Sequence, residues 1–291
     1  MRKRMKTAIL FLKSMRPKQW VKNVFVLAPL FFDHKLFDPQ SLWRAGLGFM
    51  AFCLMSGAVY VLNDIVDEKD DAKNPRKAHR PIASGALKWQ TAAVWCVPIG
   101  TIAFTLAVIV NEQFADAVLA YFILQLGYMT VFKHTPIVDV LSIATGFVLR
   151  VVAGMFAVNA ENMSLWLILC VFFLALFLGF GKRYAESING NGQSARDKNY
   201  NSHEFTGQLL NISATLCIAM YSLYTITATN LPSNHLAAMT VVFVIYGIFR
   251  YLYLVHIEKM QLAPDEALLK DRALQVDIVL WCVAMFGVMY L

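Results

Sequence analysis

Five acidic residues crowd into a nine-residue segment, residues 63–71, that directly follows a long apolar run. Three of them, Asp64, Asp67 and Asp71, are spaced i, i+3 and i+7, which places side chains on one face of a helix. Carboxylates arranged in this way repel one another, and a hard cation among them lowers that repulsion. Mg²⁺ usually binds one or two carboxylates, keeps some waters and takes phosphate oxygens for the rest. The segment, including Asn63, therefore predicts a magnesium site for a phosphate-bearing substrate.

A basic segment follows the acidic one and contains groups that can hold the phosphates themselves. Arg80 carries a rigid fork of N–H donors that suits a phosphate, and Lys77 can act as a point charge. The alternative is a solvated loop whose basic residues only follow the preference of Lys and Arg for the cytoplasmic side of a membrane. The acids directly before these bases favour a binding role.

The composition indicates an integral membrane protein. Hydrophobic residues make up 58% of the chain and charged residues 15%, and the mean hydropathy is +0.53. Soluble domains are roughly 45–50% apolar and about 25% charged. No cleavable signal peptide is expected, because the apolar stretch at residues 8–12 is short and Lys13 interrupts it. The five cysteines lie singly in apolar runs, which predicts buried thiols rather than disulfides or a zinc site.

The apolar runs predict an all-α, polytopic membrane bundle. A membrane-spanning helix needs about 20 mostly apolar residues, and nine segments come close to this. The first is the weakest, because Lys22, Asn23 and Pro29 interrupt it. The nine helices are expected to form a single transmembrane domain over residues 1–291. The predicted spans are residues 20–37, 42–62, 91–110, 114–132, 137–158, 164–181, 207–229, 235–256 and 274–291.

The distribution of basic residues predicts the orientation. With the N-terminus in the cytoplasm, 22 of the 26 Lys and Arg residues fall on the cytoplasmic side, and only Lys35 and Arg44 fall opposite. The longest cytoplasmic connections are then residues 63–90, 182–206 and 257–273. Topology thus accounts for the net charge of +7, and no nucleic-acid partner is expected. We expect a multi-pass protein of a bacterial-type cytoplasmic (inner) membrane, with a site that opens to the cytoplasm.

Two ionisable residues, Asp139 and Arg150, lie within the fifth predicted span. They are 11 residues apart, so they share a helix face but stand about 16 Å apart along the axis, too far to pair. Ionisable groups inside a membrane usually face an interior cavity. The position of Asp139 beside Lys133 favours a role in the site. For Arg150, a role in the site and a purely structural bond both stay open.

Two patterns carry a resemblance to a known family. The motif N-D-x-x-D-x-x-x-D at residues 63–71, followed by R-P-I-x-x-G at residues 80–85, resembles the UbiA-type intramembrane prenyltransferase superfamily. Its members are nine-helix bundles that bind Mg²⁺-pyrophosphate at their cytoplasmic side. Its aromatic prenyltransferases carry a second aspartate-rich motif after the sixth span. That motif is absent here, where the span ends in G-K-R-Y-A-E at residues 181–186.

This departure favours one subfamily. The segment at residues 181–186 is similar to that of decaprenyl-phosphate phosphoribosyltransferases, and so are R-P-K-Q-W-V-K-N at residues 16–23 and L-K-D-R-A-L-Q at residues 269–275. The resemblance implies a Mg²⁺-dependent transfer of the 5-phosphoribosyl group from phosphoribosyl pyrophosphate to a polyprenyl phosphate, with release of pyrophosphate. A homo-oligomer is compatible with the sequence.

The resemblance also implies roles for individual residues. The metal is expected at the acidic cluster, foremost at Asp64 and Asp67 with Asn63 beside them, and Asp71 is expected to contact either the metal or the ribose hydroxyls. The residues expected to hold the donor phosphates are Lys77, Arg80 and Lys182. Those expected at the lipid phosphate are Lys18 and Lys22. Further substrate contacts are expected from Asn23, Lys133, Asp139, Arg150, Arg183, Tyr184 and Glu186.

Two other functions would suit parts of the sequence. An aromatic polyprenyltransferase would use a polyprenyl pyrophosphate, and the missing second aspartate motif argues against it. A non-enzymatic carrier of polyprenyl phosphate would suit the charged residues inside spans. Such a carrier does not need an aspartate trio beside an arginine loop.

Overall fold

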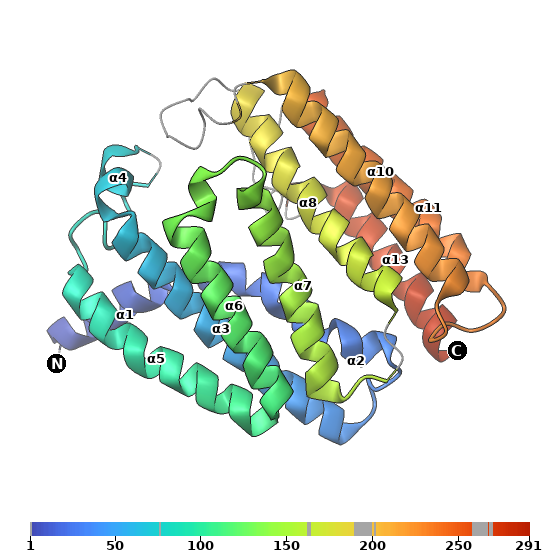
Figure 1. Ribbon diagram of the computed structural model, residues 1–291, viewed down its shortest axis with the longest axis horizontal. Coiled ribbons are helices and arrows are strands. Elements are labelled where there is room, and N and C mark those ends of the chain that lie inside the picture. Colours follow the sequence, from blue (N-terminus) through green and yellow to red (C-terminus); the bar gives the residue numbers. More distant parts are fainter. Residues whose placement is uncertain are drawn as a thin grey trace. The chain divides into compact units, whose positions relative to one another are not determined.

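A computed structural model describes residues 2–75, 77–161, 164–188, 200, 202–257, 267 and 270–291, with the side chains given from residue 6 onwards. Within these residues the regular elements are all helices, which confirms the all-α prediction (Figure 1). Large parts of the predicted loops 182–206 and 257–273, including Leu269, lie outside the described residues. The chain forms two compact units. The prediction of a single domain stays a prediction.

Unit 1 comprises Met1–Phe31, Lys35–Val131 and Leu149–Ala160. In it, α3 packs against α1, η1, α5 and α6, and α5 packs against α6. The second half of α7 also belongs to this unit. Its elements are α1 (Arg2–Ser14), the 3₁₀ helix η1 (Pro17–Leu27), most of α2 (Ala28–Phe32), α3 (Pro39–Val66), α4 (Glu68–Lys73), α5 (Trp89–Val110), α6 (Glu112–Thr130) and part of α7 (Val138–Val158).

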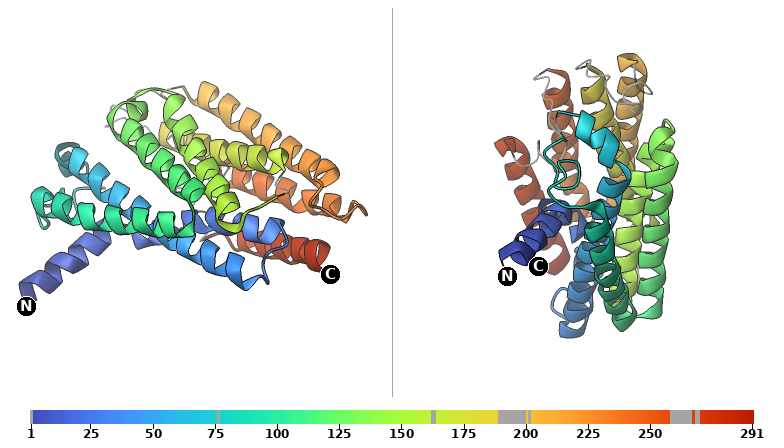
Figure 2. Two further views of the ribbon diagram at one scale, coloured as in Figure 1. Left: turned by 60° about the horizontal axis from the view of Figure 1, so that its bottom comes forward. Right: turned by 90° about the vertical axis from the view of Figure 1, so that its left-hand side faces the viewer.

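Unit 2 comprises Phe32–His34, Phe132–Val148 and Glu161–Leu291. In it, α8 packs along α10, α10 against α11, and α11 against α13, and these four helices can be followed in Figure 2. Its elements are η2 (Phe132–His134), the first half of α7, α8 (Leu165–Ile188), α10 (His203–Thr227), η3 (Leu236–Thr240), α11 (Val241–His256) and α13 (Arg272–Tyr290).

Short polar side chains fix where several helices begin. Asp38 accepts a hydrogen bond from the Ser41 amide at 2.9 Å and starts α3, and Asn111 accepts from Phe114 at 2.7 Å and starts α6. Asp271 accepts from Leu274 at 2.8 Å and starts α13. Each bond satisfies an amide that the first helical turn leaves without a partner. Hydrogen bonds from Arg250 lower the pKa of Asp271, which keeps this cap ionised.

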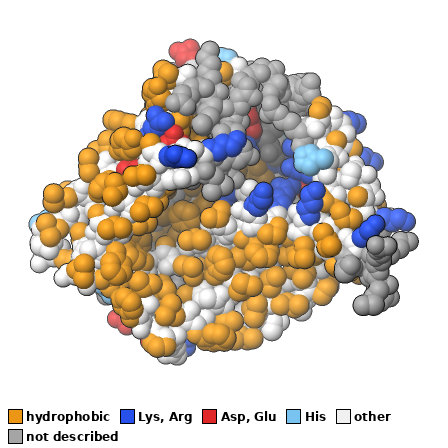
Figure 3. All heavy atoms as spheres, turned by 180° about the vertical axis from the view of Figure 1, so that it is seen from behind, with side chains coloured by type: hydrophobic (Ala, Val, Ile, Leu, Met, Phe, Trp, Pro, Cys, Tyr) orange, Lys and Arg blue, Asp and Glu red, His pale blue; other side chains and the backbone are white. Residues whose placement is uncertain are grey.

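The membrane prediction is confirmed, but the count of nine spans is not. Among the described residues, seven helices are long and apolar enough to cross a membrane. In the most apolar windows of α5 and α13, only 22% of the residues are buried inside the protein. Hydrophobic side chains also cover much of the surface in Figure 3. Soluble proteins rarely expose such continuous apolar areas, so these faces suit a lipid environment.

The first predicted span, residues 20–37, is wrong as a continuous α-helix. The chain instead forms the 3₁₀ helix η1 over 11 residues and then the short α2. A 3₁₀ helix of this length is uncommon, because its hydrogen bonds are poorly aligned. Tertiary contacts must therefore hold η1 in place.

Two residues of α7 supply these contacts in unit 1. A Cβ added at Gly154 would lie 2.1 Å from the backbone oxygen of Val26, so the two backbones touch where only glycine fits. One turn earlier, Arg150 Nε donates to Asn23 Oδ1 at 2.8 Å. Asn23 also donates to Ser56 Oγ of α3 at 3.1 Å. The 3₁₀ helix is thus bound on one side by α7 and on the other by α3.

We expect Gly154→Ala to lower the free energy of unfolding by about 1–3 kcal/mol, because the added methyl overlaps a backbone atom that cannot move aside alone. Thermal unfolding in detergent measures this. The control is Gly100→Ala in α5, where no atom lies within 4 Å of the added methyl. That variant should be unchanged or up to about 1 kcal/mol more stable, since Ala favours helices. Equal melting temperatures for the two variants would contradict the close contact.

Candidate functional site

The acidic segment spans the junction of two helices. α3 ends at Val66 and α4 begins at Glu68, with Asp67 at the junction. Asp67 has φ −90° and ψ 4°, outside the α-helical range, although i to i−4 hydrogen bonds continue on both sides of it, from the Asp67 amide to Asn63 at 2.9 Å and from the Asp71 amide to Asp67 at 2.8 Å. The single continuous helix that the spacing assumed is therefore interrupted at Asp67.

Arg80 brings two of the three aspartates together. Its Nη1 lies 3.2 Å from Asp64 Oδ1 and also contacts Asp71 Oδ2. Both carboxylates are 2% exposed. Lys77 Nζ lies 3.3 Å from the other oxygen of Asp71. Two buried carboxylates therefore meet at one guanidinium, and a lysine stands beside them.

The other two predicted metal ligands pair with each other. Asn63 Nδ2 donates to Asp67 Oδ2 at 3.1 Å. Asp67 thus contacts Asn63, one helical turn before it, whereas Asp64 and Asp71 contact Arg80.

Arg16 belongs to this cluster, and sequence reasoning missed it as a site residue. Its guanidinium pairs with Asp64 Oδ1 and lies over the Tyr60 ring, 5.0 Å from the centroid. Arg16 has φ 53°, a left-handed conformation that is rare outside glycine. The one indication in the sequence is that Arg16 is the first residue of the basic segment at residues 16–23. No residue pattern predicts the left-handed turn that brings its guanidinium to Asp64.

The charges of the cluster are arranged in two layers. The carboxylates of Asp64 and Asp71 are buried, whereas the side chains of Arg16, Arg80 and Lys77 are 27%, 22% and 39% exposed. Long basic side chains can change partners, while the carboxylates are fixed on their helices. Another cation can therefore replace a guanidinium at the buried carboxylates, and the displaced guanidinium can then bind an anion.

The donor set of this cluster fits Mg²⁺ in part. Across the described residues, no group of three or more His, Cys, Asp or Glu side chains is placed to hold a metal ion. Asp64 and Asp71, however, already share one cation. Two carboxylates suffice for Mg²⁺ when waters and phosphate oxygens complete its shell. The oxygen donors present suit a magnesium ion that arrives together with a phosphate-bearing ligand.

The basic residues near the N-terminus occupy different environments. Lys18 is exposed and Lys22 is half-buried on η1. Asn23 is 1% exposed and is bound to Arg150, which also donates to Tyr121 Oη at 3.0 Å. Asn23 and Arg150 therefore form a buried network inside unit 1, and Lys18 and Lys22 lie nearer its surface.

A second charged cluster lies in unit 2. Arg183 Nε and Nη2 lie 3.0 and 2.9 Å from Asp139 Oδ2, and Nη1 lies 2.7 Å from Glu186. Asp139 and Arg183 are both buried, whereas the side chain of Lys182 is 49% exposed and lies 4.0 Å from Glu186. Tyr200 Oη donates to Asp139 at 2.6 Å. Sequence reasoning considered only the charges of this loop and so missed Tyr200.

The remaining predicted residues also lie in unit 2. The Tyr184 ring lies against His256, with centroids 4.6 Å apart, and so packs on α11. Lys133 is 5% exposed in η2.

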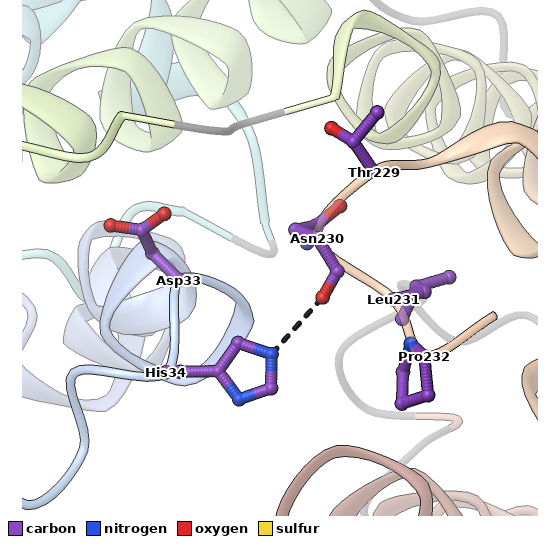
Figure 4. A pocket seen from close by; sticks show the side chains of 6 residues that line it. All are labelled: Asp33, His34, Thr229, Asn230, Leu231 and Pro232. Carbon is purple, nitrogen blue, oxygen red and sulfur yellow. Dashed lines mark hydrogen bonds between the residues drawn. The ribbon is translucent and has the colours of Figure 1, made fainter.

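A cavity of about 340 Å³ in unit 2 contains none of the predicted residues. Asp33, His34 and residues 229–232 line it, and His34 Nε2 lies 3.0 Å from the Asn230 oxygen (Figure 4). The cavity lies beyond the C-terminal end of α10, whereas Tyr200 comes just before the start of that helix in the sequence. The two ends of α10 are about 36 Å apart along the helix axis. The predicted site residues thus lie in the charged cluster of unit 1 and in that of unit 2, not at this cavity.

Known proteins are similar in sequence to this chain over most of its length. The sequence model described as the UbiA prenyltransferase family matches residues 24–267. A decaprenyl-phosphate phosphoribosyltransferase of Corynebacterium glutamicum is 32% identical over 94% of this chain and 85% of its own length. A protein of the same name from Mycobacterium tuberculosis is 30% identical over 92% of this chain and 90% of its own length.

Solved structures share the fold. A UbiA homolog from Archaeoglobus fulgidus bound to GPP and Mg²⁺ has a TM-score of 0.73 and 19% identity, and the match covers 97% of this chain and 100% of that one. A structure of a digeranylgeranylglyceryl phosphate synthase has a TM-score of 0.68 and 16% identity over 100% of both chains. At these identities the likeness shows the fold alone.

We expect Arg80→Gln to lower the free energy of unfolding by about 3 kcal/mol, because two buried carboxylates lose their shared partner. Mg²⁺ should raise the melting temperature of this variant more than that of the wild type, since the ion replaces the lost charge. Thermal unfolding with and without MgCl₂ measures both effects. The control is Lys73→Gln, an exposed cation on α4 that should change stability by less than about 0.5 kcal/mol. A variant that responds to Mg²⁺ like the wild type would contradict the bridge.

Proposed function

Because the chain belongs to the UbiA prenyltransferase family, we propose that it transfers the 5-phosphoribosyl group from phosphoribosyl pyrophosphate to a polyprenyl phosphate of the decaprenyl type. Two relatives that are 32% and 30% identical over more than nine-tenths of this chain carry the name of that activity. The observation that carries the proposal is the pair of buried carboxylates, Asp64 and Asp71, set among three basic side chains. A diphosphate with its cation needs such a set of charges.

The proposed reaction needs little covalent chemistry from the protein. An oxygen of the lipid phosphate, already ionised at neutral pH, forms a bond to the anomeric carbon of the ribose. The bond from that carbon to the pyrophosphate oxygen breaks, and the pyrophosphate leaves with the electron pair. No general base is required, so the contribution of the protein is to position the reactants and stabilise charge.

Unit 1 is proposed to hold the leaving pyrophosphate. Arg16, Arg80 and Lys77 would turn from the carboxylates to the pyrophosphate oxygens, where a guanidinium can donate two parallel hydrogen bonds. Asp64 and Asp71 would then hold Mg²⁺, which when bound neutralises charge on the leaving group. Asn63 and Asp67 lie beside them and are proposed as further ligands, directly or through water.

The remaining basic residues are proposed to bind the other two phosphate groups. Lys182 is exposed at the edge of the second charged cluster, in unit 2, and we assign it to the 5-phosphate of the donor. Lys18 and Lys22 are assigned to the lipid phosphate. Arg183 is buried and bound to Asp139 and Glu186, so we assign it to positioning rather than to direct phosphate binding.

We further propose that the site faces the cytoplasm of a bacterial-type inner membrane. The bias of Lys and Arg toward one side of the predicted spans supports this orientation. The sugar donor is soluble and highly charged, so it would reach the site from the cytoplasm.

The test uses purified protein, Mg²⁺, phosphoribosyl pyrophosphate labelled in the ribose, and decaprenyl phosphate. We expect label in the lipid extract and an equal amount of pyrophosphate, both abolished by EDTA. Asp64→Asn should lower the rate by about 100-fold or more, because charge stabilisation at the leaving group is lost. Asp116→Asn, which removes an exposed carboxylate on α6, is the matched control and should keep the rate.

Two results would overturn the proposal. One is the absence of lipid-extractable label with active, folded protein. The other is turnover only with a polyprenyl pyrophosphate and an aromatic acid, which would identify an aromatic prenyltransferase instead.

A further inference from the structure

The Tyr200 hydroxyl makes two hydrogen bonds within unit 2. Its side chain is buried, with 3% of the residue exposed. The hydroxyl donates to Asp139 Oδ1 at 2.6 Å and accepts from the backbone amide of Ile137, also at 2.6 Å. The donor and acceptor functions of a single hydroxyl are therefore both used, and both bonds reach the start of α7.

The backbone at Ile137 is strained, and the bond from its amide stabilises it. Ile137 has φ 70°, a conformation that β-branched residues rarely adopt. The Val138 amide donates to the Pro136 oxygen at 2.8 Å across it, the i to i+2 bond of a γ-turn, which is strained at positive φ. This turn leads directly into α7 and places Asp139 in its first turn. The Tyr200 hydroxyl thus supports both the turn and the carboxylate that follows it.

Asp139 in turn fixes the charged end of α8. Its Oδ2 binds two nitrogens of Arg183, at 3.0 and 2.9 Å. The third nitrogen of Arg183 binds Glu186 at 2.7 Å, and Glu186 lies 4.0 Å from Lys182. The Tyr200 ring also lies 5.8 Å from the Arg183 guanidinium. Contacts therefore run without a break from Tyr200 to the exposed ammonium of Lys182.

We propose that Tyr200 is a positioning residue for donor binding: through Asp139 it fixes Arg183, and through Arg183 and Glu186 it sets the place of the Lys182 ammonium. This inference rests on the proposed function, in which Lys182 binds a phosphate of the sugar donor. A phenylalanine would fill the same buried space, so the positioning depends on the hydroxyl alone.

The hydroxyl is a constant donor over the working range of pH. Burial and the hydrogen bond to Asp139 raise the pKa of Tyr200 well above its ordinary value near 10. The group stays protonated in the folded and the unfolded protein below about pH 10, so it adds no pH dependence near neutrality.

The experiment compares Tyr200→Phe with Tyr221→Phe. Tyr221 is also buried in unit 2, and its hydroxyl also makes two bonds, to Thr240 and Trp281, both at 2.7 Å. Each variant loses one buried hydroxyl and two hydrogen bonds, so their losses of stability should be similar. Only Tyr200→Phe should raise the KM for phosphoribosyl pyrophosphate, by about tenfold, with kcat within about twofold. Tyr221→Phe should leave both constants within about twofold.

A second readout does not depend on turnover. Binding of ribose 5-phosphate, measured by calorimetry, should weaken in Tyr200→Phe and not in Tyr221→Phe, because Lys182 is assigned to the 5-phosphate. Binding of inorganic pyrophosphate with Mg²⁺, which is assigned to unit 1, should be unchanged in both variants. Asp139→Asn should raise the KM for the donor as well. The double variant Tyr200→Phe/Asp139→Asn should be no worse than Asp139→Asn alone, because both changes act through Arg183. If Tyr200→Phe does not fold, the KM for the donor is compared between Asp139→Asn and Tyr221→Phe instead.

Three results would overturn the inference. The first is a Tyr200→Phe protein that binds and turns over the donor like the wild type. The second is additivity of the two changes in the double variant. The third is equal effects on KM from Tyr200→Phe and Tyr221→Phe. Wild-type protein that neither binds pyrophosphate nor transfers the phosphoribosyl group would overturn the proposed function as well, so the two failures are distinguishable.

Discussion

The contact of Arg80 with Asp64 and Asp71 is the constraint on which the site in unit 1 depends. Two carboxylates that are withdrawn from water destabilise the fold unless a cation accompanies them. Arg80 and Arg16 supply that charge from two segments far apart in sequence. The end of α3, the turn before η1 and the loop after α4 are therefore held together by one electrostatic requirement.

Arginine and lysine take different positions in both clusters. Arg183 is buried between Asp139 and Glu186, and Arg80 joins two buried aspartates. Lys182 and Lys77 are more exposed at the edges of these groups. A guanidinium is planar, always charged and able to bind several acceptors, so it suits a fixed bridge. An ammonium on a flexible stem suits an arriving phosphate. The same division of roles thus appears independently in each unit.

The sequence predicted the parts of the site that depend on residue type. Hydropathy located the long helices, and the predicted association of Arg80 with the acids at residues 63–71 is seen in its contacts with Asp64 and Asp71. It did not predict Arg16 or Tyr200 as site residues. Their contacts depend on the turn at Arg16 and on the start of α7, where Arg16 and Ile137 have positive φ. Helical periodicity assumes a continuous helix, so it could not predict the break at Asp67 or the 3₁₀ winding of η1 either.

The 3₁₀ winding of η1 has a consequence for how this segment can evolve. With three residues per turn, its side chains fall into three straight rows rather than a gradual spiral. Lys18, Val21 and Val24 are exposed on one row, while Asn23 and Val26 on another row are buried between α3 and α7. Inserting or deleting one residue would rotate every later row by a third of a turn. Apolar substitutions at Val21 and Val24 should be tolerated, while the length of the segment is held constant.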